Sequence, residues 1–294
     1  AEKLSITKAA EILNMTQPAA SIQLKKLQDQ FDIPLTEVIG RKLYVTDFGW
    51  ELYRIALRVL EEVDTIEYHS QNYKGILSGK LRISVVSTGK YLMPYYLKDF
   101  LQLNPKIDLE LDVTNKQKVI SSLEQNEVDF SLISVLPKQL LVNEEILMPN
   151  KLFLFGPSDF PTKEVGKLDA SVFKKLPLIF REEGSGTRFT MQEYFHKTHI
   201  RPKVGLSLSS TEAVKQAVIA GLGVSVLSIL SLKNELKQKD IKVIPVKGFP
   251  LYSQWRLVWL EKKQPSVVAQ AYLKYLRTHK TAIYKKHFAW TEKY

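Results

Sequence analysis

The first thirty residues repeat apolar positions with the period of an α-helix. Ile6, Ala9, Ala10 and Leu13 recur three or four residues apart, which predicts a short helix over residues 4–13. Asn14 and Met15 then interrupt the pattern and indicate a turn, because asparagine favours turn conformations.

A second helix is predicted directly after this turn. Thr16 provides an N-cap hydroxyl, and Gln17 and Pro18 occupy the first helical positions, where proline loses no hydrogen bond. The apolar residues expected to be buried along this helix are Ala20, Leu24, Leu27 and Phe31. Two short helices joined by a tight turn, the second with a polar outer side, are typical of a helix-turn-helix.

A small hairpin and a long helix follow. Gly40 and the basic residues after it, in front of a β-type run, predict a wing. Thr46 or Asp47 can cap the long helix, which we expect to occupy residues 47–76. Its apolar positions are Phe48, Leu52, Ile55, Val59, Val63 and Ile66. This spacing is that of a coiled-coil seam and predicts pairing with a second copy of the chain.

Strands alternate with helices from residue 80 onward. The first series predicts strands at 81–86, 108–113 and 129–134 and helices at 91–103 and 119–125. The second predicts strands at 151–155, 178–180, 204–208, 225–227 and 255–260 and helices at 189–199, 212–220 and 266–276. Such alternation favours parallel sheets with both faces covered, here in two α/β lobes with a crevice between them.

Composition narrows the class of protein. The chain has 294 residues, 45% of them hydrophobic and 25% charged, as in ordinary globular proteins. It contains no cysteine, which excludes disulfides, thiol nucleophiles and thiolate metal sites. No apolar run is long enough to cross a bilayer and no signal peptide is recognisable, so we expect a cytoplasmic protein without membrane contact. The net charge is +11, but much of the excess lies near the C-terminus, so charge alone locates no DNA-binding surface.

Residues 9–21, AAEILNMTQPAAS, resemble the helix-turn-helix signature of LysR-type transcriptional regulators. The match continues through Leu27, residues 33–35, Gly40-Arg41 and the Thr46-x-x-Gly49 pattern. In residues 85–94 and 180–188 the chain is similar to the RuBisCO-operon (CbbR-like) regulator branch of that family.

The resemblance implies an α/β protein with an all-α N-terminal part. Residues 1–46 would form a winged helix-turn-helix whose first helix precedes Ala1, and residues 47–76 the linker and dimerisation helix. Residues 80–294 would form a two-lobed, periplasmic-binding-protein-like (type 2) effector domain, with lobe I at 80–150 and 255–294 and lobe II at 151–254. The implied partners are a double-stranded DNA operator, RNA polymerase, a small effector and further copies of the chain in a homodimer or homotetramer.

The candidate DNA-binding residues lie on the second helix and the wing. They are Thr16, Gln17, Pro18, Ser21, Gln23, Lys25, Lys26, Arg41 and Lys42. Gln17 can pair bidentately with adenine, and the basic residues can contact phosphates. An isolated helix of this kind would more simply be a well-capped surface helix, but the surrounding signature favours DNA binding.

The candidate effector-binding residues follow strands or begin helices. They are Ser87, Thr88, Lys90, Asn115, Ser134, Ser185, Gly186, Thr187, Arg188, Ser210 and Thr211, with Lys116 beside Asn115 at the rim. Hydroxyls and backbone N–H groups at several helix N-termini facing one crevice suit a carboxylate or a phosphate. Each of these residues alone could be a simple N-cap, and only their coincidence favours a small anionic effector.

Two other classes of protein remain open alternatives. A stand-alone solute-binding protein would share the two-lobed fold, but it would carry a secretion signal and no helix-turn-helix. An enzyme could also be built on such lobes, although the chain has no nucleophile-elbow sequence and no Walker motif. We therefore expect no catalytic residue, no cofactor and no metal.

Overall fold

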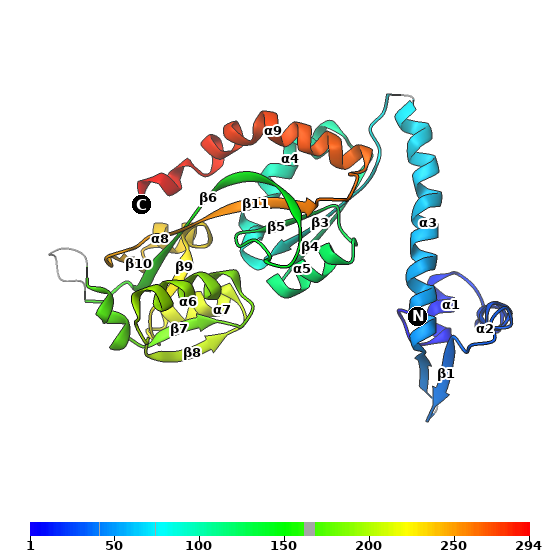
Figure 1. Ribbon diagram of the computed structural model, residues 1–294, viewed down its shortest axis with the longest axis horizontal. Helices are drawn as coiled ribbons and strands as arrows, with labels where there is room; N and C mark the ends of the chain where they lie inside the picture. Colours follow the sequence, from blue (N-terminus) through cyan, green and yellow to red (C-terminus); the bar gives the residue numbers. More distant parts are fainter. Residues whose placement is uncertain (41, 74, 162–167) are drawn as a thin grey trace. The chain divides into compact units, whose positions relative to one another are not determined.

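The computed structural model describes residues 1–40, 42–73, 75–161 and 168–294. The chain divides into two compact units, unit 1 at Ala1–Gly75 and unit 2 at Ile76–Tyr294. In Figure 1 unit 1 is coloured blue to cyan and unit 2 cyan to red. Within the described part of the chain, no helix combines the length and the apolar character that crossing a membrane requires.

Unit 1 contains the predicted helices and hairpin. Its elements are α1 (Ile6–Ile12), α2 (Gln17–Gln28), β1 (Thr36–Ile39), β2 (Lys42–Val45) and α3 (Asp47–Tyr73). The hydroxyl of Thr16 accepts a hydrogen bond from the N–H of Ala19 at 3.4 Å, which confirms the predicted N-cap of α2.

Thr46, and not Asp47, caps the start of the long helix α3. Its hydroxyl accepts from the N–H of Gly49 at 3.0 Å and donates to the carbonyl of Pro34 at 2.6 Å. Gly49 has no room for a side chain, because a Cβ would lie 2.1 Å from the carbonyl oxygen of Leu35. The start of α3 is therefore fixed against the segment that precedes the wing.

The predicted burial of the apolar side of α2 is wrong. Leu27 is 43% exposed, and no residue of the helix is fully buried. The physical reason is that α1 covers only part of this side, and Ala20, Leu24 and Leu27 line an open apolar groove together with Ile12 of α1. The seam of α3 is likewise uncovered in the single chain, with Ile66 71% exposed. Its pairing with a second copy stays a prediction.

Unit 2 is built on a mixed sheet, in the order β10-β6-β11-β5-β3-β4 with β9 also beside β6. The strands are β3 (Gly79–Val86), β4 (Ile107–Thr114), β5 (Phe130–Ile133), β6 (Val142–Pro157), β9 (Ser225–Ser228), β10 (Ile241–Ile244) and β11 (Leu251–Leu260). A separate pair consists of β7 (Leu178–Arg181) and β8 (Val204–Leu208).

The predicted parallel pairing is confirmed in part. Strand β3 lies parallel to β4 and β5, and β7 lies parallel to β8. It is wrong for β6, which begins at Val142 rather than at residue 151 and pairs antiparallel with β11, β9 and β10. Sequence periodicity missed this because residues 142–150 do not alternate between apolar and polar side chains as a half-buried strand does.

Helices cover the sheets on both sides. They are α4 (Met93–Leu103), α5 (Lys116–Glu124), α6 (Gly186–Thr198), α7 (Thr211–Ile219), α8 (Lys233–Gln238) and α9 (Val267–His287). Short 3₁₀ turns are η1 (Ser87–Tyr91), η2 (Ala170–Lys174), η3 (Ile229–Leu232) and η4 (Ala289–Lys293). Several predicted bounds were wrong: α5 begins earlier, at Lys116, as do α6 at Gly186 and β11 at Leu251. Helix α9 continues past residue 276 to His287, and its Ile283 is buried.

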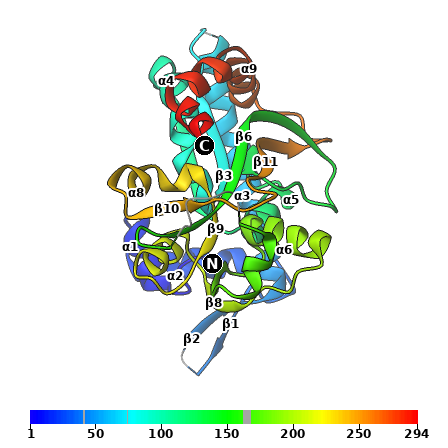
Figure 2. The ribbon, with the colours of Figure 1, turned by 90° about the vertical axis from the view of Figure 1, so that its left-hand side faces the viewer.

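Unit 2 has two main hydrophobic cores joined by the same two strands. One core lies beneath α4 and α9, which lie side by side in both views (Figure 1, Figure 2), and it includes Leu147 of β6 and Leu257 of β11. The other lies around β7 and α6 and includes Leu152 and Leu154 of β6. This arrangement is that of a two-lobed domain, while the exact lobe limits stay a prediction.

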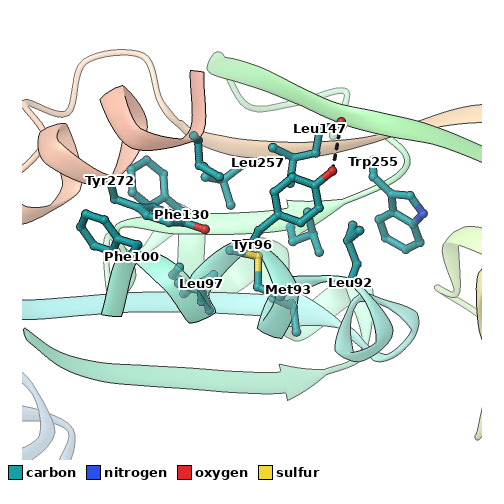
Figure 3. Close-up of a cluster of buried hydrophobic side chains, with 14 of the residues drawn as sticks. Leu92, Met93, Tyr96, Leu97, Phe100, Phe130, Leu147, Trp255, Leu257 and Tyr272 are labelled. Atoms are coloured by element: carbon teal, nitrogen blue, oxygen red, sulfur yellow. Dashed lines mark hydrogen bonds between the residues drawn. The ribbon is translucent and has the colours of Figure 1, made fainter. Parts of the chain in front are cut away.

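The first core contains one unsatisfied hydroxyl. Figure 3 shows Tyr96 donating to the carbonyl of Leu147, at 3.3 Å, and Tyr272 beside Phe100 and Phe130. The hydroxyl of Tyr272 is buried and has no hydrogen-bond partner among the residues that the structure describes. Burial also raises the pKa of this phenol well above its ordinary value of 10.0.

We predict that Tyr272→Phe stabilises unit 2 by about 1 kcal/mol, because it removes a desolvated hydroxyl without removing a hydrogen bond. The midpoint of thermal unfolding of unit 2, measured by calorimetry, should rise by roughly 2–4 °C. The matched variant Tyr96→Phe loses a hydrogen bond and should lower the midpoint. An unchanged or lower midpoint in Tyr272→Phe would contradict the assignment.

Candidate functional site

A cavity lies at the carboxyl ends of the parallel strands of unit 2, between the two cores. Its empty space, counted with the opening to solvent, is about 450 Å³, and a water-sized sphere finds about 20 Å³ of room inside it. Most of the predicted effector-binding residues line it, namely Ser87, Thr88, Asn115, Ser134, Ser185, Gly186 and Thr187, and so does Lys116. Residues predicted from separate strand ends and helix starts are therefore brought to one place.

Four predicted residues do not line the cavity, because each is engaged elsewhere. Lys90 lies 3.6 Å from the Glu212 carboxylate, and Arg188 donates to the carbonyl of Arg181 at 3.0 Å. Ser210 caps α7, accepting from the N–H of Ala213 at 3.3 Å. Thr211 accepts a hydrogen bond from Arg181.

Arg181 is the cavity residue that sequence reasoning missed most clearly. Its side chain is 3% exposed, and its Nε and Nη2 atoms donate to the carboxylate of Glu182 at 2.7 and 2.8 Å. Nη1 donates to Thr211 at 2.5 Å, and Nη2 also donates to Ser87 at 3.2 Å. Arg181 ends β7 whereas Ser87 follows β3, so this guanidinium joins the two lobes across the cavity. The available signal was an arginine at the end of an otherwise apolar strand.

Two groups at the cavity have hydrogen-bonding capacity that the described protein residues do not use. Ser185 is the N-cap of α6 but makes no side-chain capping hydrogen bond, so the first N–H groups of this helix have no hydroxyl acceptor from it. Trp255 is 1% exposed, and its Nε1 atom has no hydrogen-bond partner within the described residues. In Figure 3 the indole nitrogen of Trp255 points away from the hydrophobic cluster. Buried donors without acceptors are costly, and they favour an anionic or carbonyl-bearing ligand here.

Lys116 adds a positive charge to the same cavity. Its ammonium lies 5.1 Å from the ring centroid of Phe189, and among the described residues it has no carboxylate at ion-pair distance. Burial lowers the pKa of Lys116 below its ordinary value of 10.5, and the nearby Lys138 lowers it further. A bound anion would raise the pKa of Lys116 again, because an opposite charge stabilises the ammonium.

A polar network joins the strands at the cavity wall. Ser228 of β9 donates to the Oδ1 atom of Asn150 at 2.6 Å, and the Nδ2 atom of Asn150 donates to Ser253 at 2.9 Å. Asn150 and Ser228 both line the cavity, and neither was predicted. They could not be identified from sequence, since the pairing of β6 with β9 and β11 was not foreseen.

A charged cluster at the start of α7 links it to η1. Glu212 accepts hydrogen bonds from Tyr91 and Lys215, the latter at 2.8 Å. Burial alone would raise the pKa of Glu212, but these hydrogen bonds and the charges of Lys215 and Lys90 outweigh it, and the pKa falls below 4.5. Burial and the Glu212 hydrogen bond raise the pKa of Tyr91 to about 12.

The candidate DNA-binding residues lie on an accessible surface of unit 1. Thr16, Gln17 and Pro18 are exposed at the start of α2, and Ser21 is half-buried. Gln23, Lys25, Lys26 and Lys42 are exposed as well. Arg41 lies outside the described residues. The start of α2 thus presents short polar groups to solvent, as a helix that enters a DNA groove must.

Two family models together match nearly the whole chain. Residues 1–50 match the bacterial regulatory helix-turn-helix protein model of the lysR family, and residues 74–281 match the LysR substrate binding domain. The chain belongs to the LysR family of transcriptional regulators. The family resemblance predicted from the helix-turn-helix signature is thereby confirmed.

Curated relatives support the predicted branch of the family. The transcriptional activator CmpR of Synechocystis sp. is 36% identical, over 95% of this chain and 92% of the relative. The RuBisCO operon transcriptional regulator of Allochromatium vinosum is 34% identical, over 92% of this chain and 90% of the relative. This LysR regulator is thus similar to RuBisCO-operon regulators over most of its length.

Solved structures show the same fold. The regulatory domain of Synechocystis CcmR in complex with 2-PG is 33% identical, with a TM-score of 0.66, over 69% of this chain and 98% of that chain. Full-length CbnR complexed with its target DNA has a TM-score of 0.73 at 18% identity, over 95% of both chains, and supports the fold alone.

We predict that Glu212 makes the stability of unit 2 depend on pH. A carboxylate with a lowered pKa stabilises the folded state above its unfolded pKa, and this contribution is lost as the pH falls through the folded value. Glu212→Gln cannot titrate, so the thermal midpoints of the native protein and of this variant should differ near neutral pH and converge below pH 4.5.

The matched control is Glu124→Gln, an exposed carboxylate at the end of α5, which should leave the midpoint unchanged. A constant difference between the native protein and Glu212→Gln at all pH values would show that Glu212 acts through shape and not through its charge.

Proposed function

We propose that this LysR regulator binds operator DNA through α2 and the wing, and binds a small metabolite with a phosphate or carboxylate group in the cavity of unit 2. The observation that carries the effector assignment is the convergence of donors without protein acceptors. The ammonium of Lys116, the indole N–H of Trp255 and the start of α6 all meet in one cavity.

The similarity to CcmR supports a more specific ligand class. The CcmR domain, 33% identical to this chain, was solved in complex with 2-PG. A molecule such as 2-phosphoglycolate carries a phosphate and a carboxylate at its two ends. The cavity offers a helix N-terminus on the side of lobe II and Lys116 on the side of lobe I, so a two-headed anion could hold both lobes together.

The DNA assignment rests on unit 1. The start of α2 is polar and exposed, and an exposed seam on α3 is suited to bring two copies of this helix together. A homodimer or homotetramer would then hold recognition helices over spaced half-sites. Effector binding would shift the lobes and change DNA contact or contact with RNA polymerase. Such a protein works by binding rather than by catalysis, in the cytoplasm with the chromosome.

For the DNA site, we predict that Gln17→Ala weakens specific operator binding about tenfold or more, because a bidentate base contact contributes about 1–3 kcal/mol of discrimination. The measurement is a gel shift with the operator and with an unrelated duplex, and binding to the unrelated duplex should not change. The control Gln30→Ala changes an exposed glutamine after the end of α2. Equal operator affinity in both variants would rule out base recognition by Gln17.

For the effector site, we predict that Lys116→Gln weakens binding of 2-phosphoglycolate roughly ten- to a hundredfold in calorimetry, because it removes a charge-assisted hydrogen bond. Trp255→Phe should weaken binding by a smaller factor, since it removes a neutral donor. Operator affinity without ligand should remain unchanged in both variants.

The matched control for these variants is Lys118→Gln, an exposed lysine on the same helix that does not line the cavity. If Lys118→Gln weakens the ligand as much as Lys116→Gln, the contribution is a long-range charge effect and the assigned cavity is wrong.

A further inference from the structure

A second pocket lies next to the effector cavity and shares η1 with it. Ser87 and Thr88 of this turn line the effector cavity, whereas Lys90 and Tyr91 line the second pocket. A water-sized sphere finds about 380 Å³ of room in the second pocket, against about 20 Å³ in the first. It combines residues of η1 and α4 with residues of α8 and the C-terminal end, so both lobes contribute to it.

Aromatic rings form much of its wall. Tyr95 lies with its ring centroid 4.8 Å from that of His287 and 5.3 Å from that of Phe288. Tyr95 is nevertheless 42% exposed, and Trp290 is half-buried at the same pocket. Accessible ring faces in a concave site favour a flat, ring-containing ligand.

Among the charged side chains around this pocket, one ammonium has no carboxylate partner within the described residues. Lys215 is buried and is paired with both Glu212 at 2.8 Å and Glu235 at 2.6 Å, and Lys90 shares Glu212. Lys233 has no carboxylate at ion-pair distance among the described residues, and its ammonium lies 5.8 Å from the ring centroid of Trp290. Three ammonium groups thus face two carboxylates.

His287 adds a ring to this wall, and its surroundings disfavour the charged form of that ring. Its burial, together with the charge of Lys286, lowers its pKa below the ordinary value of 6.5. The surplus charge of the pocket therefore resides at Lys233, directly beside an aromatic face.

We propose that the second pocket binds a small molecule with a flat aromatic ring and a single negative charge, the ring against Tyr95 and Trp290 and the anionic group at Lys233. This site is separate from the effector site proposed above, and it selects a different ligand. The effector cavity presents hydroxyls and helix N–H groups suited to small, highly charged anions, whereas this pocket presents rings and one uncompensated ammonium.

The test is equilibrium dialysis of the full-length protein against 1-naphthoate, followed by the fluorescence of the naphthalene ring. The matched ligands are 1-naphthalenemethanol, which keeps the ring without the charge, and acetate, which keeps the charge without the ring. We expect one naphthoate per chain, about tenfold weaker binding of the alcohol and no measurable binding of acetate.

Variants locate the bound ring. Lys233→Gln should weaken naphthoate about tenfold and leave the alcohol unchanged, whereas Tyr95→Leu should weaken both ligands. Lys237→Gln is the matched control, since it removes an exposed lysine of the same helix that does not line the pocket. Tyr95 is partly exposed, so its replacement leaves the core intact, and Lys233→Gln removes only a surface charge.

The outcomes separate this site from the effector cavity. Naphthoate binding that responds to Lys116→Gln and not to Lys233→Gln would place the ligand in the first cavity and overturn the second site. Absence of naphthoate binding, or equal binding in Lys233→Gln and Lys237→Gln, would overturn it as well. None of these results bears on 2-phosphoglycolate binding, which is measured separately.

Discussion

Strand β6 pairs with β11 from Val142 beside Leu260 to Leu152 beside Leu251, and unit 2 depends on this one antiparallel ladder. One end of the ladder supplies Leu147 and Leu257 to the core beneath α4 and α9, and β6 continues with Leu152 and Leu154 into the core around β7. Both cores therefore include residues that this ladder holds in register. The cavity lies where the two cores meet, so the same backbone pairing sets both stability and site geometry.

The buried polar groups at this junction are expensive for the fold. Arg181 is removed from water and is compensated by Glu182, Thr211 and Ser87, while the indole N–H of Trp255 has no such compensation among the described residues. A core built for stability alone would use apolar side chains at such positions, because replacing buried polar groups by apolar ones often costs nothing. The presence of these polar groups fits a site at which they form hydrogen bonds with a ligand.

Much of this fold follows from local sequence signals. Residue type and position identify the N-caps at Thr16 and Thr46 and the hydroxyls after β3. Periodicity identifies the helices. Features that depend on pairing between distant strands do not follow from local signals. Residues 142–150 lack a strand pattern, and Asn150 and Ser228 reach the cavity only through the antiparallel contacts of β6. The burial of α2 was overestimated for the related reason that an amphipathic pattern indicates which side is apolar, but not how much of it is covered.

The turn η1 has a consequence for communication within unit 2. Gly89 holds it tightly against β5, since a Cβ there would lie 2.8 Å from the Leu132 side chain. Ser87 is tied to Arg181 at one end of the turn, and Tyr91 is tied to Glu212 at the other. This short segment lines both cavities. A ligand that displaced it on one side would therefore change the free energy of binding on the other. Thermodynamic linkage would make that change equal in both directions.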